Sequence, residues 1–107
     1  MKTDTPLACN MNVFTPVQRE NHIQTTIQLM QGLQLVKELN NGYKFIFPNK
    51  TELITTIAEF ISNERLCCPF LEFDLNIISN SESISLSLVG PAGTQEFLRA
   101  EFSGAFQ

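Results

Sequence analysis

The stretch N-G-Y-K-F-I-F-P at residues 41–48 decides the fold, because it joins a turn signal to an alternating strand. Asn41-Gly42 favours a type I′ hairpin turn, which needs a positive φ at both central residues. The aromatic residues after the turn share one face of the predicted strand: Tyr43, Phe45 and Phe47. Residues 33–39 also alternate, so the two segments predict a β-hairpin that ends at Pro48.

One helix is predicted before this hairpin and another after it. Residues 15–18 read T-P-V-Q and combine an N-cap, a proline at the first helical position and a capping-box glutamine. Helical spacing predicts that this first helix, which ends near Gly32, buries an apolar stripe: Ile23, Ile27 and Met30. Asn49 and Glu52 make a second capping signature, for a helix over residues 50–67. Proline disfavours helical geometry in the residue before it, so this helix should stop close to Cys68.

The remainder of the chain repeats the order of hairpin and helix. Residues 71–77 and 84–88 alternate apolar and polar side chains, with a turn near residues 80–81, and predict a second hairpin. Thr94 is the expected cap of a third, short helix, whose apolar residues are Phe97, Leu98 and Phe102. The order α-β-β-α-β-β-α predicts an α+β two-layer sandwich, with a four-stranded, mainly antiparallel sheet and helices packed on one face. The 107 residues suit a single domain, with residues 1–14 as an extended N-terminal arm.

Charge and cysteine usage narrow the classes of partner. The formal charge is -4 and only seven Lys and Arg are present, so we expect neither nucleic acid nor anionic lipid as a partner. No signal peptide or membrane-spanning run is recognisable, which predicts a cytoplasmic protein without a membrane partner. Three cysteines, two of them adjacent, are a poor framework for structural disulfides, so we expect reduced thiols.

The segment E-R-L-C-C-P-F at residues 64–70 is the main chemical feature. If Leu53 defines the apolar stripe of its helix, Glu64 falls at roughly 20° from it, Cys67 at roughly -40° and Cys68 at roughly 60°. The three side chains are therefore predicted to converge on the buried side. A carboxyl group there must find a partner or take up a proton. Glu64 is then either a proton-transfer group or a structural acceptor, for a loop or for Arg65.

Binding of a soft ion is a better explanation for these thiols than reactivity through a thiol pKa that the protein itself lowers. They lie at a helix C-terminus, where the helix dipole does not lower the pKa of a thiol. A coordinated metal, by contrast, deprotonates the thiol that binds it. Our leading hypothesis is a small binding protein that holds a thiophilic metal or metalloid ion through Cys67, Cys68 and Cys9, with Glu64 balancing charge. The only histidine, His22, is a weaker fourth ligand and is expected at the surface, off the predicted stripe.

Two alternatives stay open. One is a thiol-based redox enzyme that acts on a small thiol-reactive ligand, with Cys67 and Cys68 as catalytic candidates and Glu64 as proton carrier. The other is an interaction module, such as a homodimer, in which the cysteines only pack and Phe102 and Phe106 cover a partner.

The central motif also carries a resemblance. Residues 64–73, together with G-P-x-G-x-x-E-F-L at residues 90–98, resemble a family of short bacterial proteins with an E-R-x-C-C-P-F signature. The similarity includes an early cysteine, as at Cys9, and a Gly-Tyr turn, as at Gly42-Tyr43. No activity is established for that family, so the resemblance implies a shared site at the double cysteine and no particular cofactor.

Overall fold

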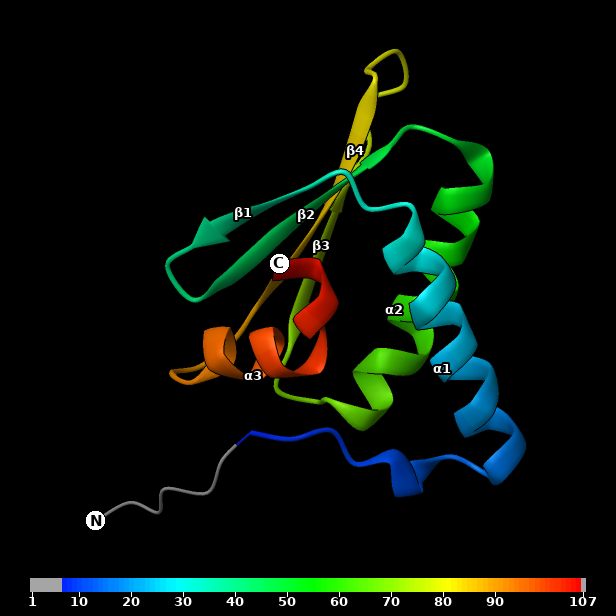
Figure 1. Ribbon diagram of the computed structural model, residues 1–107, viewed down its shortest axis with the longest axis vertical. Helices are drawn as coiled ribbons and strands as arrows, with labels where there is room; N and C mark the ends of the chain where they lie inside the picture. The colour runs from blue at the N-terminus through cyan, green and yellow to red at the C-terminus, as the bar shows by residue number, and fades with distance from the viewer. Residues whose placement is uncertain (1–6, 107) are drawn as a thin grey trace.

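The computed structural model describes residues 7–106, which form three α-helices and a four-stranded antiparallel sheet (Figure 1). The elements are η1 (Met11–Val13), α1 (Pro16–Gln31), β1 (Leu35–Leu39), β2 (Gly42–Pro48), α2 (Thr51–Cys67), β3 (Glu72–Asn76), β4 (Ser83–Val89), α3 (Thr94–Glu101) and η2 (Ser103–Phe106), where η denotes a 3-10 helix. The predicted α+β class and the order of helices and strands are confirmed.

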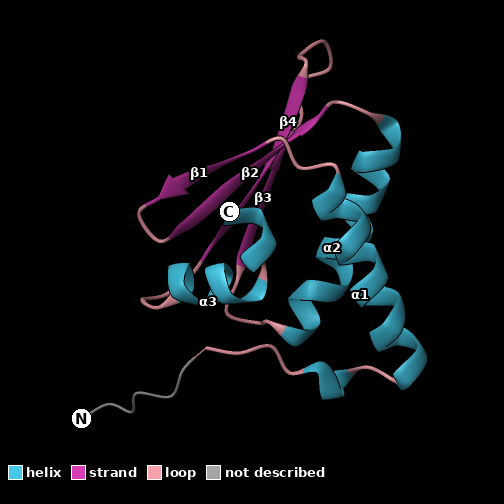
Figure 2. Cartoon of the chain, viewed as in Figure 1, coloured by secondary structure: helices cyan, strands magenta, loops and turns pink. Residues whose placement is uncertain are grey.

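The sheet has the order β1-β2-β4-β3, so the second strand of each hairpin lies at its centre (Figure 2). One face carries the core side chains of these two central strands: Tyr43, Phe45, Phe47, Ile84, Leu86 and Leu88. Phe102 connects the layers, because its ring lies 6.0 Å from that of Phe45 and 6.1 Å from that of Phe60 on α2. The helices therefore pack on this one face, as predicted.

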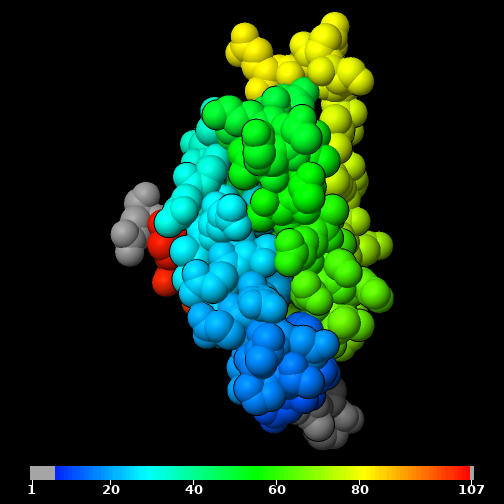
Figure 3. Space-filling view, turned by 90° about the vertical axis from the view of Figure 1, so that its right-hand side faces the viewer, coloured from blue at the N-terminus to red at the C-terminus, as the bar shows by residue number. Residues whose placement is uncertain are grey.

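Helix α1 packs along α2 (Figure 3). It buries a different face from the predicted one. Its buried residues are His22, Thr25 and Leu29, whereas Ile23 is 40% exposed and Ile27 is 46% exposed. The predicted stripe is thus wrong for Ile23 and Ile27, whereas Met30 is partly buried and packs against the core. The physical reason is that α2 presents a buried carboxylate and an aromatic ring to α1, and His22 satisfies the first and stacks on the second.

The turn of the first hairpin also differs from the prediction. Leu39 pairs with Gly42, so Asn40 and Asn41 form the loop and Gly42 already belongs to β2. Within residues 7–106 only Gly93 has a positive φ, which excludes a type I′ turn. Gly42 is needed for another reason: a Cβ there would collide with the carbonyl of Leu88 on the neighbouring strand.

Of the predicted helix caps, one is confirmed and two are wrong. Thr15 and Gln18 form the expected capping box of α1. Lys50, and not Asn49, is the N-cap of α2, because the Asn49 amide donates to three carbonyls in the β3–β4 connection. Thr94 is the first residue of α3, and its hydroxyl donates to the carbonyl of Pro91 in the preceding turn.

The N-terminal segment is attached to the end of α2. The backbone N–H of Asn10 donates to the carbonyl of Cys67 at 2.7 Å, which holds residues 7–10 against the helix terminus. The predicted extended arm is interrupted by the 3-10 turn Met11–Val13, and its residues 1–6 lie outside the described part. No helix within residues 7–106 combines the length and apolar character that crossing a membrane requires.

Candidate functional site

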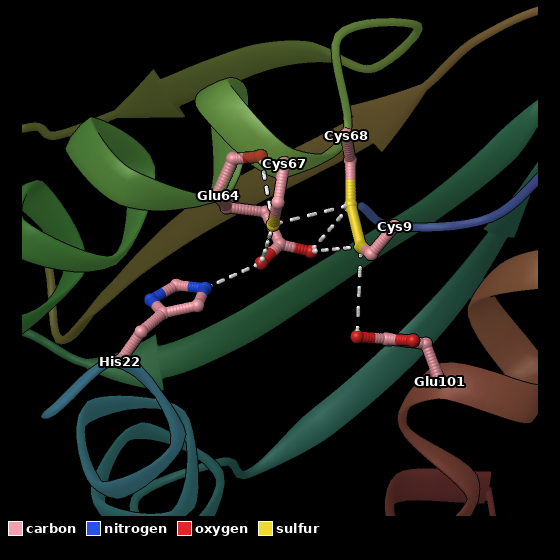
Figure 4. The surroundings of a disulfide bond; sticks show 6 residues. All are labelled: Cys9, His22, Glu64, Cys67, Cys68 and Glu101. Atoms are coloured by element: carbon pink, nitrogen blue, oxygen red, sulfur yellow. Dashed lines mark hydrogen bonds and ion pairs between the residues drawn. A yellow bond between two sulfur atoms is a disulfide. The ribbon is translucent and has the colours of Figure 1, made fainter. Parts of the chain in front are cut away.

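The predicted site residues of α2 converge as expected. Glu64 is 2% exposed and the side chains of Cys67 and Cys68 are fully buried (Figure 4). Cys68 is the C-cap: its N–H donates to the carbonyl of Glu64 at 2.8 Å, while its backbone leaves helical geometry before Pro69. Both cysteine side chains thereby turn toward the Glu64 carboxylate.

Cys9 joins this cluster from the N-terminal segment, in a disulfide with Cys68. Their Cα atoms lie 4.7 Å apart although 59 positions separate them in sequence. The bond from Asn10 to the end of α2 brings Cys9 within reach. The expectation of three reduced thiols is wrong for this structure, in which Cys67 is the free cysteine and is buried.

Glu64 lies at the centre of the cluster. Its Oε1 atom is 2.7 Å from Nε2 of His22 and 3.8 Å from Sγ of Cys67. Its Oε2 atom lies 3.3 Å from Sγ of Cys68 and 3.7 Å from Sγ of Cys9. Because disulfide sulfurs carry no proton, the last two distances are contacts and become hydrogen bonds only after reduction. In the oxidised protein His22 and Cys67 are the donors to this carboxylate.

His22 is a buried partner of the site, which overturns the prediction of a surface residue. Its side chain is 3% exposed and lies between the rings of Phe14 and Phe60, at 5.5 and 5.7 Å. Among the described residues Nδ1 has no hydrogen-bond partner. The arrangement favours the tautomer that donates Nε2–H to Glu64, because an unpaired Nδ1 lone pair is better tolerated than an unpaired N–H. His22 therefore orients the carboxylate and does not contact sulfur as a ligand.

Glu101, at the end of α3, is a site residue that the sequence analysis missed. Its Oε2 atom lies 3.7 Å from Sγ of Cys9 (Figure 4). Partial burial and the nearby Glu64 carboxylate raise its pKa. Burial, Glu64 and then Glu101 also raise the pKa of the Cys67 thiol to about 12. The cluster thus disfavours further negative charge and would gain most from a cation.

The spacing of residues held a signal for both missed groups. His22 precedes Thr25 by three and Leu29 by seven, so the three residues share a helix face. Glu101 follows Phe97 by four and Leu98 by three, which places it beside the buried face of α3. A prediction that selects the buried face of a helix only by its hydrophobic residues leaves out His22 and Glu101, because both are polar.

A set of four potential ligand atoms results. One atom each from Cys9, Glu64, Cys67 and Cys68 lies within 4.8 Å of all the others. The three sulfurs predicted from the sequence are therefore brought together, and Glu64 joins them as a fourth potential ligand. A disulfide withholds two of the sulfurs from coordination, so reduction is required before all four can bind one ion.

Family models, curated proteins and solved structures were each compared with this chain, and none of them matched it. Functional inference therefore depends on the chemistry of the site.

Proposed function

We propose that the reduced protein binds a soft metal or metalloid ion through Cys9, Cys67 and Cys68, with Glu64 as a fourth ligand or charge-balancing group. The observation that carries this proposal is the set of four potential ligand atoms within 4.8 Å of one another. Thiolate sulfur is the ligand type that zinc, copper(I), mercury(II) and arsenic(III) share.

Charge supports a cation at this position. Two carboxylates, Glu64 and Glu101, face the sulfurs, and the pKa of Cys67 rises to about 12 in response to burial and these charges. A bare thiolate is therefore expensive, whereas a bound cation compensates for burial and repulsion together. The hydrogen bond from His22 holds the Glu64 carboxylate in place for such an ion, as an outer-shell partner does in metal sites.

The redox state of the protein decides whether the site is open. Reducing the Cys9–Cys68 disulfide takes two electrons and two protons and leaves three thiols beside Glu64. Metal binding then releases the thiol protons. We accordingly expect the oxidised protein to bind soft ions far more weakly than the reduced one.

Anaerobic titration tests this function. The protein is reduced with a phosphine, desalted, and titrated with zinc, copper(I), mercury(II) and arsenite, while native mass spectrometry counts bound ions and ultraviolet absorbance follows sulfur-to-metal charge transfer. We expect one ion per chain and a loss of at least about 100-fold in affinity for Cys67→Ser plus Cys68→Ser. Glu64→Gln should cost about 10- to 100-fold. Unchanged affinity in the double serine variant would exclude the proposed site.

One observation favours thiol redox chemistry as a second candidate. The Sγ atom of Cys67 lies 3.7 Å from Sγ of Cys68, the partner of Cys9 in the disulfide. Attack of a Cys67 thiolate on Cys68 would form a Cys67–Cys68 disulfide and release Cys9 as a thiolate, without net oxidation. The raised pKa of Cys67 opposes that first step, which is why metal binding is the preferred proposal.

A further inference from the structure

A groove of about 900 Å³ runs along the C-terminal half of α1 and extends to Glu101 at the edge of the candidate site. In Figure 1 the red C-terminal segment and the cyan end of α1 lie on the same face of the sheet. Residues of both segments line this groove. Most of its lining is apolar and comes from α1, β1 and η2, including Ile27, Met30, Leu35, Val36 and Phe106. A bare metal ion needs no such surface, whereas a small organic ligand does.

Glu101 is the point at which groove and site meet. The residue lines the groove, and its carboxylate is 3.7 Å from Sγ of Cys9. Cys67 and Cys68 are fully buried, whereas Cys9 is only half-buried. A molecule in the groove therefore meets the site at Glu101, and Cys9 is the sulfur next to that carboxylate.

We infer that the ligand is a trivalent arsenic centre that carries one apolar organic group, with the arsenic on the sulfurs and the organic group in the groove. This inference rests on the proposed function, because it gives the substrate class of the same thiol site. A single organic substituent leaves arsenic two positions for sulfur, and the cluster supplies them once the disulfide is reduced. The apolar lining then shields the substituent from water.

The binding step conserves electrons. A phosphine first gives two electrons to the oxidised protein and a water molecule gives two protons, so the Cys9–Cys68 bond breaks into two thiols and the phosphine takes up the water oxygen as its oxide. Two thiols next displace the two hydroxyls of R–As(OH)₂. Two As–S bonds form, two As–O bonds break, each thiol proton leaves on a hydroxide as water, and arsenic stays trivalent.

Two probes that differ only in their organic group test the inference: phenylarsonous and methylarsonous acid. Each affinity for the reduced protein is divided by that for dithiothreitol, a dithiol without a groove, which removes the intrinsic preference of arsenic for sulfur. We expect the normalised affinity for the phenyl compound to be at least about tenfold higher, a factor that corresponds to about 1.4 kcal/mol.

Ile27 and Ile23 supply a matched pair of variants on α1. Ile27 lines the groove and is 46% exposed, whereas Ile23 is 40% exposed and is not part of the lining. Ile27→Asp should reduce the phenyl preference to near unity, and Ile23→Asp should keep it. Leu35→Asp, at a 50% exposed lining position on β1, repeats the test independently of α1.

The outcomes separate the two proposals. Equal normalised affinities, or a phenyl preference that survives both lining variants, overturn the organic ligand but leave the thiol site intact. Binding of zinc, copper(I) or mercury(II) without binding of either arsenical also overturns the organic ligand, whereas failure of all of these ions and of arsenite to bind the reduced protein overturns the thiol site itself. A phenyl preference that disappears only in the lining variants supports both.

Discussion

The Nε2 atom of His22 lies 2.7 Å from Oε1 of Glu64, and the two side chains are 3% and 2% exposed. This contact joins α1 to α2 through their buried faces, and the same Oε1 atom of Glu64 lies 3.8 Å from Sγ of Cys67. A buried carboxylate without a partner is costly, so the pair is part of the core as well as of the candidate site.

The His22–Glu64 pair should be strongly coupled in stability. His22→Ala leaves the Glu64 carboxylate buried and unpaired, and we expect a loss of about 3 to 5 kcal/mol in the free energy of unfolding. A double-mutant cycle with Glu64→Ala, followed by urea denaturation, measures the coupling energy. Thr25→Ala, at another buried polar position of α1, is the control. Additive effects of the two alanine substitutions would contradict the coupling.

The Cys9–Cys68 disulfide should stabilise the folded chain. It closes a loop with a sequence separation of 59, for which loop-closure entropy gives about 4 kcal/mol. Adding a phosphine reductant should therefore lower the urea midpoint of the wild type and leave that of Cys9→Ser plus Cys68→Ser unchanged. Coincident midpoints with and without reductant would show that the bond contributes nothing.

Cys67 should resist alkylation while the protein is folded. Its pKa of about 12 leaves about one thiolate in ten thousand at pH 8, and the side chain is fully buried. Intact mass after iodoacetamide treatment should show no adduct on the oxidised folded protein and one adduct after denaturation. The slow reaction should accelerate about tenfold per pH unit between pH 8 and 11. Rapid labelling at pH 7 would contradict the assigned pKa shift.

Glu101 should destabilise the fold increasingly as the pH rises. Because its folded pKa is raised, the folded state holds the proton more tightly than the unfolded state. The stability that protonated Glu101 contributes is present below its pKa in the unfolded state and is lost as the pH rises through its pKa in the folded state. As the pH rises from 4 to 7, the urea midpoint of Glu101→Gln should therefore increase relative to the urea midpoint of the wild type. Glu96→Gln, on the exposed side of α3, is the control. The same difference in urea midpoint between Glu101→Gln and the wild type at pH 4 and at pH 7 would refute the effect.

Gly42→Ala should destabilise the sheet. Its added methyl group meets the backbone of Leu88, which cannot move aside without disturbing the β2–β4 pairing. We expect a loss of about 1 to 3 kcal/mol by thermal or urea denaturation. Gly104→Ala has no atom within 4 Å of the new methyl group and should leave stability nearly unchanged. Equal stability of both variants would remove the steric argument.

Local patterns determined the order of elements and the phase of the double cysteine. Alternation and turn residues placed both hairpins, and a rotation of about 100° per residue placed Glu64 between Cys67 and Cys68 on the buried side of α2. These properties depend on neighbours within one or two helical turns, which is why a sequence alone reveals them.

Tertiary packing decided what those groups meet. His22 pairs with a carboxylate 42 positions away, and Cys9 bonds a cysteine 59 positions away. The contact between Cys9 and Glu101 spans 92 positions. No local pattern encodes such pairings, because each depends on how α1, α3 and the N-terminal segment dock on α2. Helix α1 buries the face that carries His22, and not the face that carries the isoleucines, for the same reason. The buried His22 gives the Glu64 carboxylate a hydrogen-bond partner, whereas an isoleucine at that position would leave the carboxylate charge unpaired.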